Sequence, residues 1–158
     1  MATQTESRSF TGQDIVSGPF GGPGGEHYSE RGENLTEFHA WGTSRDGFFV
    51  VSAIQFFWDG KPGRIVGTPD DNHYKSIRFN HDERIKNMTI HAGHEQGYVD
   101  NITFETNQGH KFEVGGNGGE VHPINVGSGH WLGADGGDDF GGLRGAKGVV
   151  DRIRVYFR

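Results

Sequence analysis

A unit that joins a strand bearing an aspartate to a cluster of glycines recurs along this chain, and it restricts the possible folds more than any other feature. The clearest copy is the segment Gly97–Glu120, GYVDNITFETNQGHKFEVGGNGGE. Apolar residues alternate on both sides of the turn sequence Asn107–Gln108–Gly109, which predicts a β-hairpin, and the glycine cluster GGNGG closes the unit. The segment therefore indicates antiparallel strands joined by tight turns.

The same unit occurs again, divided between the two ends of the chain. The C-terminal sequence GVVDRIRVYF contains the aspartate, Asp151, and the N-terminal sequence FGGPGGE contains the glycines. A third, degenerate copy, FFVVSAIQFFWDGKPGRIVGTPDD, has Ser52 in place of the aspartate. Equivalent positions of the three copies, 48 and 51 residues apart, are marked by Ile54, Ile102 and Ile153.

This repetition predicts an all-β fold. Repeats of about 50 residues are too short to bury a sheet face alone, so we expect three of them to pack around one axis. Short alternating strands predominate, and no segment has a convincing helical period. We therefore predict a closed prism or barrel with pseudo-threefold symmetry. In it, the two halves of the split copy pair as neighbouring strands, so the chain ends leave no open sheet edge.

Local patterns predict where particular strands and loops lie. We expect a strand at Phe10–Ser17 and another at Phe48–Trp58, with a bend or bulge at Ser52. The acidic, glycine-rich segment Ala134–Leu143 indicates a loop, and Val149–Phe157 indicates the final strand.

Length, charge and composition set the class of protein. A chain of 158 residues is long enough for one core, and we expect a flexible polar lead over residues 1–9 and one domain over residues 10–158. The net charge of −6 argues against nucleic acid as the main partner. The absence of cysteine excludes disulfides and thiol chemistry. We find no secretory signal and no segment that would insert into a membrane, so the expected location is cytoplasmic, with unconventional secretion as the alternative.

An aspartate beside clustered glycines is suited to a polar, uncharged ligand such as a sugar. A carboxylate accepts hydrogen bonds from two hydroxyls at once, and its charge strengthens those bonds. Glycines allow backbone N–H groups to approach the ligand closely and donate to its oxygens. The hairpin topology would place Asp100 near Gly115–Gly119 and Asp151 near Gly21–Gly25. Since one such pair alone usually marks a turn, the recurrence of the pair is what favours binding.

Two tyrosines and the degenerate copy bear on how such sites would differ. Tyr28 and Tyr98 are expected to present aromatic faces at the rims of the two sites. The third copy has Ser52 for the aspartate and Thr68–Pro69–Asp70–Asp71 for the glycine cluster. We expect it to be structural, or to bind something else weakly.

Other functions have weaker support in the sequence. Glu26 and Glu120 follow the two glycine clusters, which leaves a glycosidase open. A structural or assembly protein is a further alternative, with Phe56–Trp58 as an apolar contact patch if these residues are exposed. No phosphate-binding motif is present. His91 and His94, and the acidic pairs of the chain, lack the spacing of metal sites, so we expect no metal and no cofactor.

From about Ser17 to Arg158, the chain resembles the jacalin-related lectins. The best-matching segments are SGPFGGPGGE, YVDNITFETNQG and GLRGAKGVVDRIRVYF. The resemblance implies a β-prism of three Greek-key sheets, metal-independent binding of mono- and oligosaccharides, and no enzymatic activity. The first glycine cluster is internal to the chain, which is similar to the mannose- and glucose-type group rather than to cleaved, galactose-type members. The implied partners are mannose-type glycans and glycoproteins, and a homo-oligomer such as a dimer is expected.

By the same resemblance, the chain is expected to carry two sugar sites. Site 1 comprises Gly21, Gly22, Gly24, Gly25, Gly148, Val149, Val150 and Asp151. Site 2 comprises Gly97, Tyr98, Val99, Asp100, Gly115, Gly116, Gly118 and Gly119. The family spaces its glycine and aspartate four residues apart, whereas Gly148 and Gly97 each lie three residues before the aspartate of their site.

Overall fold

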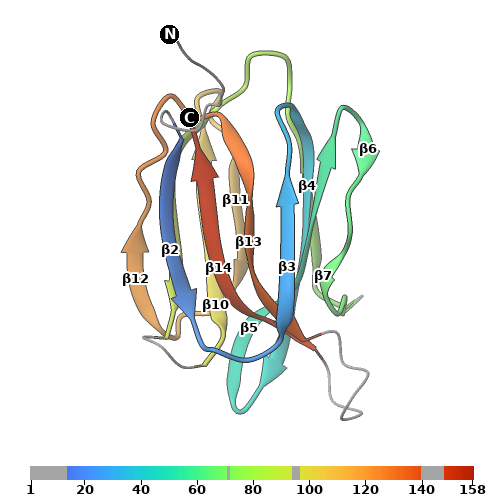
Figure 1. The fold of residues 1–158 in the computed structure, drawn as a ribbon, viewed down its shortest axis with the longest axis vertical. Coiled ribbons are helices and arrows are strands. Elements are labelled where there is room, and N and C mark those ends of the chain that lie inside the picture. Colours follow the sequence, from blue (N-terminus) through green and yellow to red (C-terminus); the bar gives the residue numbers. More distant parts are fainter. Residues whose placement is uncertain (1–13, 71, 94–96, 140–147) are drawn as a thin grey trace, which may run out of the picture.

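The computed structural model describes residues 14–70, 72–93, 97–139 and 148–158, and these residues fold entirely as β-strands and connecting loops (Figure 1). In chain order the strands are β2 (Ile15–Gly21), β3 (Glu26–Arg31), β4 (Leu35–Arg45), β5 (Phe48–Trp58), β6 (Lys61–Pro62), β7 (Val66–Gly67), β8 (Tyr74–Arg78), β9 (Ile85–Ala92), β10 (Val99–Thr106), β11 (Lys111–Gly115), β12 (Glu120–Pro123), β13 (Trp131–Asp139) and β14 (Val149–Phe157). The described part of the chain contains no helix that could cross a membrane. The predicted polar lead over residues 1–9 lies outside the described residues.

The strands form three antiparallel sheets with one shared connectivity. The strand orders are β2-β14-β13-β3, β11-β10-β9-β12 and β6-β5-β4-β8, and β7 also pairs with β5. In each sheet, two strands that are consecutive in the chain lie at the centre, and a loop that crosses one end of the sheet joins two outer strands. Figure 1 shows such a loop at the lower end of the molecule, between β2 and β3. This connectivity is the Greek key, and the prediction of a β-prism of three such sheets is confirmed.

The two ends of the chain complete one sheet together. Strand β2, near the N-terminus, pairs with β14 at the C-terminus, with Gly21 opposite Arg152 and Ile15 opposite Phe157. The split copy of the repeat is therefore joined by strand pairing, as predicted. Its first strand differs from the prediction: within the described residues it runs from Ile15 to Gly21, so Gly18–Pro19 lies inside the strand rather than after it.

Glycines at equivalent positions of the three sheets show the pseudo-threefold symmetry directly. Gly21, Gly67 and Gly115 have φ angles of 108°, 85° and 96°. A Cβ added at these positions would lie 2.2, 2.1 and 2.0 Å from a backbone oxygen of the facing strand. Glycine is therefore required at all three positions, both for its φ angle and for the close strand approach.

Aromatic rings from all three sheets meet at the centre of the prism. The ring of Phe38, which is fully buried, lies 4.8 Å from the ring of Trp131 on β13. It also lies 5.2 Å from Phe56, 6.1 Å from Phe104 and 5.4 Å from Phe112. Ring separations in this range are those of favourable aromatic pairs. Phe38 therefore packs against residues of all three sheets in one shared core.

Replacing Phe38 by alanine is expected to destabilise the protein by about 3–5 kcal/mol, because the change removes a fully buried ring and leaves a cavity that its neighbours cannot fill. Equilibrium urea denaturation measures the loss. Val121→Ala is the control, since the Val121 side chain is 57% exposed and its truncation should change the stability by less than about 0.5 kcal/mol. A loss for Phe38→Ala no larger than that of the control would contradict this account of the core.

The expected loop at Ala134–Leu143 is wrong for its described part. Residues 134–139 form the second half of β13 and are buried as far as Asp138, while residues 140–143 lie outside the described residues. The glycines of this segment serve close strand packing, because a Cβ at Gly136 would lie 2.1 Å from the backbone oxygen of Arg152. Composition indicated a loop, but the tertiary packing of β13 between β3 and β14 explains these glycines.

The proposed apolar contact patch is also wrong. Phe56 is fully buried, and Phe57 and Trp58 are half-buried.

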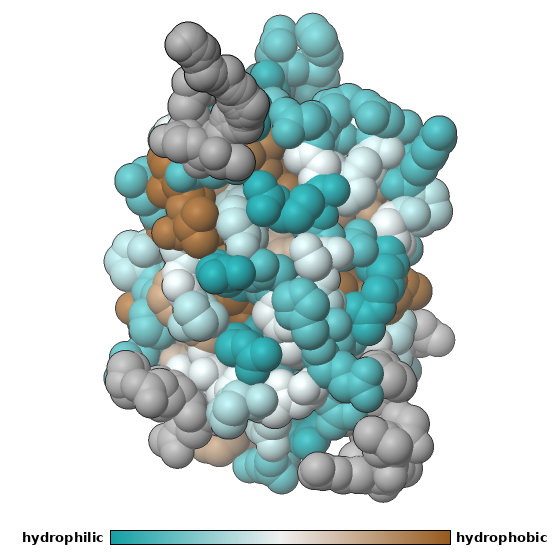
Figure 2. Space-filling model, in the orientation of Figure 1, coloured by the Kyte–Doolittle hydropathy of each residue, from teal (hydrophilic) through white to brown (hydrophobic). Residues whose placement is uncertain are grey.

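Tyr28, expected at a site rim, is only 2% exposed, and its hydroxyl donates to the backbone oxygen of Arg152 at 3.0 Å. The face shown in Figure 2 is largely hydrophilic, with apolar atoms in small separate areas.

Candidate functional site

A β-bulge places the key side chain in each of the three repeats. Ser52, Asp100 and Asp151 are the extra residues of the three bulges, because the strand register skips each of them. A bulge redirects the side chain of the extra residue and bends the strand locally. The bulge predicted at Ser52 is confirmed, and each of the two aspartates is the bulged residue at the equivalent position of its own sheet.

In site 1, the glycine loop after β2 covers the carboxylate of Asp151. A Cβ at Gly25 would lie 2.6 Å from Oδ2 of Asp151, and one at Gly24 would lie 3.1 Å from Oδ1. The N–H of Gly22 donates to the backbone oxygen of Asp151 at 2.9 Å. The structure thus brings the N-terminal glycines and the C-terminal aspartate together, as the sequence analysis expected.

Site 2 repeats this construction in another sheet. A Cβ at Gly119 would lie 2.5 Å from Oδ2 of Asp100, and one at Gly118 would lie 2.9 Å from Oδ1. The N–H of Gly116 donates to the backbone oxygen of Asp100 at 2.9 Å. Two glycine-rich loops therefore lie against two aspartates in matching geometry.

Both carboxylates are buried, yet no described residue donates a hydrogen bond to either of them. Asp100 is 8% exposed and Asp151 is 7% exposed, and Oδ2 of Asp151 is fully buried without a partner. Buried polar groups in proteins are nearly always hydrogen-bonded, because leaving them unpaired is unfavourable. A carboxylate that lacks donors among the described residues and keeps some exposure, as both aspartates do, is suited to accept a hydrogen bond from a ligand hydroxyl.

The surroundings of the two aspartates raise the pKa of both carboxyl groups. The pKa of Asp151 is raised to about 6, first by burial and then by the nearby carboxylates of Asp139 and Asp138, against the opposite effects of Arg45 and Arg152. Burial also raises the pKa of Asp100, while His91 partly offsets the shift. Because the folded pKa of Asp151 lies above its unfolded value, ionisation of Asp151 lowers the stability of the ligand-free fold as the pH rises through about 6.

Ligand binding through Asp151 is expected to weaken as the pH falls from 7 through about 6, because the protonated carboxyl loses acceptor capacity. The variant Asp100→Asn isolates this site, and a pH series of calorimetric titrations with methyl α-mannoside measures the effect. The same titrations on Asp151→Asn provide the comparison. Binding to Asp100→Asn that stays constant from pH 7.5 to about 5 would contradict the expectation.

The remaining predicted residues of site 1 can contribute only backbone groups. Gly148, Val149 and Val150 are all buried. Both valine side chains are fully buried, that of Val150 within the main core, and a Cβ at Gly148 would lie 1.7 Å from the backbone oxygen of Asp139. A glycine is therefore needed here for the packing of β14 against β13, whatever its role toward a ligand.

In site 2, Tyr98 is held at the rim by the neighbouring sheet. Its hydroxyl donates to Oδ2 of Asp46 at 2.6 Å, and the guanidinium of Arg45 lies 4.9 Å from its ring centre. Gly97 is exposed with a φ of 77°, and Val99 is fully buried. Of the two tyrosines expected at the rims, only Tyr98 is partly accessible.

The degenerate copy differs in where its acidic group lies. Ser52 is fully buried, and its hydroxyl has no hydrogen-bond partner. The facing loop carries the carboxylate instead, since Oδ2 of Asp70 accepts a hydrogen bond from the hydroxyl of Thr43 at 2.9 Å. Asp71 lies outside the described residues. The third copy therefore lacks the combination of a strand carboxylate with bare loop amides.

Asp138 has a structural role that the sequence did not reveal. It is fully buried, and Oδ2 accepts hydrogen bonds from Arg64 at 3.0 Å and from the N–H of Gly67 at 2.8 Å. Its carboxylate therefore connects β13 to the loop and strand around β7 in the neighbouring sheet. Within the described residues, no group of three or more acidic or histidine side chains is arranged to hold a metal ion.

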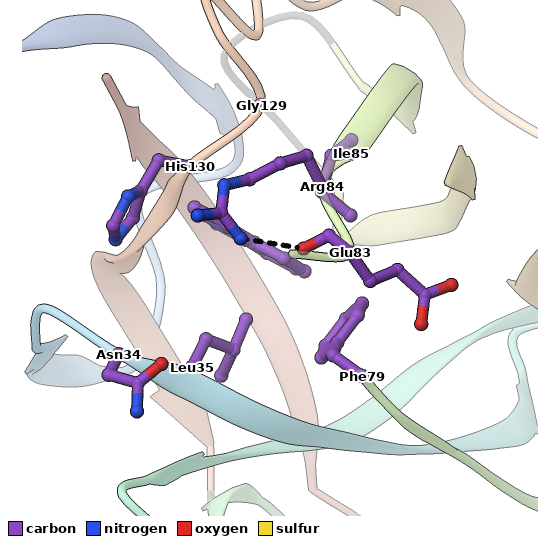
Figure 3. A pocket seen from close by; sticks show the side chains of 9 residues that line it. Asn34, Leu35, Phe79, Glu83, Arg84, Ile85, Gly129 and His130 are labelled. Carbon is purple, nitrogen blue, oxygen red and sulfur yellow. Dashed lines mark hydrogen bonds between the residues drawn. The ribbon is translucent and has the colours of Figure 1, made fainter. Parts of the chain in front are cut away.

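A small cavity is present near Trp131, lined by Leu35, Phe79 and Arg84 among others (Figure 3). Its volume of about 50 Å³ is too small for a sugar ring. In Figure 3, the carboxylate of Glu83 points away from Asn34 and His130. That carboxylate accepts a hydrogen bond from the hydroxyl of Thr106 at 2.5 Å. The cavity is therefore a weaker candidate than the two aspartate sites.

Comparison with known proteins identifies the family. The family model described as jacalin-like lectin domain matches residues 17–156. The chain belongs to the jacalin-like lectin domain family. This membership assigns a lectin, a non-enzymatic class of carbohydrate-binding protein, as the sequence analysis predicted. A search of curated proteins finds no match.

Solved structures share the fold of this lectin domain at low sequence identity. The mannose-binding lectin from Champedak is 18% identical with a TM-score of 0.72, over 94% of this chain and 99% of that one. Artocarpin in complex with mannotriose is 19% identical with a TM-score of 0.70, over 91% and 97%. The lamprey immune protein is 23% identical with a TM-score of 0.72, over 91% of this chain but only 44% of its own. This chain therefore spans less than half of the lamprey protein.

Proposed function

We propose that this lectin domain binds mannose- or glucose-type glycans without a metal ion, at two sites built around Asp100 and Asp151. The observation that carries the proposal is the repeated geometry: two buried carboxylates without described donors, each beside a loop of glycines. The known structures of mannose-binding relatives support the choice of sugar.

At each site, the aspartate and the loop would have complementary roles. The carboxylate accepts hydrogen bonds from hydroxyls of one sugar ring, and its negative charge strengthens those bonds. Loop N–H groups donate to hydroxyl oxygens, and the absence of side chains at the loop glycines allows the ring to approach closely. At site 2, the partly accessible ring of Tyr98 adds an aromatic face for the C–H side of the sugar.

Calorimetric titration of the whole chain with methyl α-mannoside tests this function. We expect a stoichiometry near two and an affinity on the order of millimolar, as is usual for a small, open site. A chain that shows no heat of binding with mannosides or glucosides would contradict the proposal.

The glycosidase alternative has a direct assay, which is the release of reducing sugar from mannose oligosaccharides. We expect none. Glu26 lies opposite Asp138 on β13 and Glu120 lies opposite Ala92 on β9, so the two glutamates belong to different sheets. Both are exposed. This placement does not provide the facing carboxylates that glycoside hydrolysis uses.

Two sites on one chain would let the protein bind multivalent glycans with increased avidity. The predicted homo-oligomer would add to this effect, and the molar mass in solution tests it. A mass equal to one chain at the concentrations used for binding would contradict the oligomer but leave the two-site proposal intact.

A further inference from the structure

A groove of about 580 Å³ runs along the junction between two sheets, directly beside the glycine loop of site 2. One wall is the segment Gly115–Asn117 of that loop, and the other includes Phe49 of β5, together with His73 just before β8 and Tyr74 at its start. The volume falls within the range of protein sites that bind small molecules.

Aromatic rings line the groove, and their positions are fixed. The ring of His73 lies 4.8 Å from the ring of Phe49 in an edge-to-face arrangement. Tyr74 is 47% exposed, and its ring lies 5.2 Å from the ring of Trp41. The hydroxyl of Tyr74 is hydrogen-bonded to Nδ1 of His39 at 2.8 Å. A large exposed ring held in this way provides a flat surface at little entropic cost to binding.

The groove and the aspartate site lie against neighbouring parts of one loop. A Cβ at Gly116 would lie 2.5 Å from the backbone oxygen of Phe49, on the groove side. A Cβ at Gly118 would lie 2.9 Å from Oδ1 of Asp100 and 3.4 Å from the ring of Phe48, on the site side. Phe48 is 58% exposed. Consecutive residues of β5 therefore place one aromatic ring by the site and the next in the groove.

Polar side chains complete the lining of the groove. Asn72, Lys75, Glu113 and Asn117 are all exposed along its edges. Aromatic faces together with amide, ammonium and carboxylate groups are the combination that recognises sugar rings, which have apolar C–H faces and hydroxyl edges.

We propose that this groove binds the further residues of a glycan chain whose terminal ring lies at Asp100, so that site 2 recognises an oligosaccharide rather than a single sugar. The inference rests on the proposed function of site 2. A related groove beside site 1, lined in part by Phe20 and His122, has those two rings stacked on each other at 4.4 Å. Because each of those rings covers the other, that groove offers less free aromatic surface to a sugar than the groove at site 2.

The test uses the full chain carrying Asp151→Asn, in which only site 2 is expected to bind sugar. Calorimetry measures its affinity for methyl α-mannoside and for mannotriose. We expect mannotriose to bind about tenfold more tightly than methyl α-mannoside, since it adds contacts in the groove. Adding Tyr74→Ala should weaken mannotriose binding by about fivefold or more and leave methyl α-mannoside binding unchanged. Tyr74→Phe keeps the ring and should retain most of the difference.

Ile65→Ala is the matched control, because Ile65 is 40% exposed and lies outside the groove. Equal affinities for the two ligands, or a Tyr74→Ala variant that behaves like Ile65→Ala, would overturn the groove proposal while the sugar site stands. If the Asp151→Asn chain binds neither ligand, the proposed function of site 2 fails, and the groove proposal fails with it.

Discussion

Gly119→Ala is expected to remove sugar binding at site 2, with affinity there falling by more than about a hundredfold. The new Cβ would lie 2.5 Å from Oδ2 of Asp100 and 2.8 Å from the backbone of Ala92, so the loop would have to move away from the carboxylate. The φ of 75° at Gly119 adds strain for any residue with a Cβ. The ligand would then lose the loop N–H donors and part of the access to the carboxylate.

Gly25→Ala should have the same effect at site 1, where the Cβ would lie 2.6 Å from Oδ2 of Asp151. The matched control is Gly109→Ala. Gly109 has a φ of 85°, but a Cβ there would meet nothing within 4 Å. Calorimetry should show about one remaining site for each loop variant and two for the control. Two sites of normal affinity in Gly119→Ala or Gly25→Ala would show that the loop-to-carboxylate contact is not needed for binding.

Asp100→Asn and Asp151→Asn are each expected to eliminate one of the two sites, and the double variant should bind no mannoside. An amide of the same shape keeps one acceptor oxygen but replaces the other with a donor, so a hydroxyl donor of the sugar loses its partner. Each hydrogen bond to a charged group contributes about 1.5–3 kcal/mol, so losing the charge and one acceptor should lower affinity by about a hundredfold.

The controls for the aspartate variants are Glu26→Gln and Glu120→Gln, which neutralise exposed carboxylates just after the two glycine loops. Both should keep two sites, because neither glutamate is part of the aspartate geometry. Thermal unfolding checks that every variant is folded. Full stoichiometry in Asp100→Asn or Asp151→Asn would mean that the site in question was assigned to the wrong residue.

The sequence predicted the repeated architecture because the repeat itself carries the physical constraint. Gly21 and Gly115 are required where an outer strand passes close to the neighbouring strand, because a Cβ at either position would meet the backbone oxygen of Asp151 or Asp100. A residue pair that recurs in register indicates one geometry used more than once. The pairing of the two chain ends followed from the same repetition.

What the sequence did not predict depends on tertiary packing. The acidic segment that continues β13 resembles a loop in composition, yet its glycines allow strands to pack closely and Asp138 anchors a neighbouring sheet. Tyr28 is buried because the hydroxyl of its side chain reaches the backbone of β14. The groove beside site 2 escaped prediction altogether, since Phe49 and Tyr74 are far from Gly116 in sequence and meet only through the packing of two sheets.

A crystal structure of the chain soaked with methyl α-mannoside tests the central claim most directly. We expect one sugar ring at each of two places, with hydroxyls within hydrogen-bond distance of the carboxylate of Asp100 or Asp151 and of N–H groups of the adjacent glycine loop. Sugar bound elsewhere on the prism, with both aspartates uncontacted, would contradict the account.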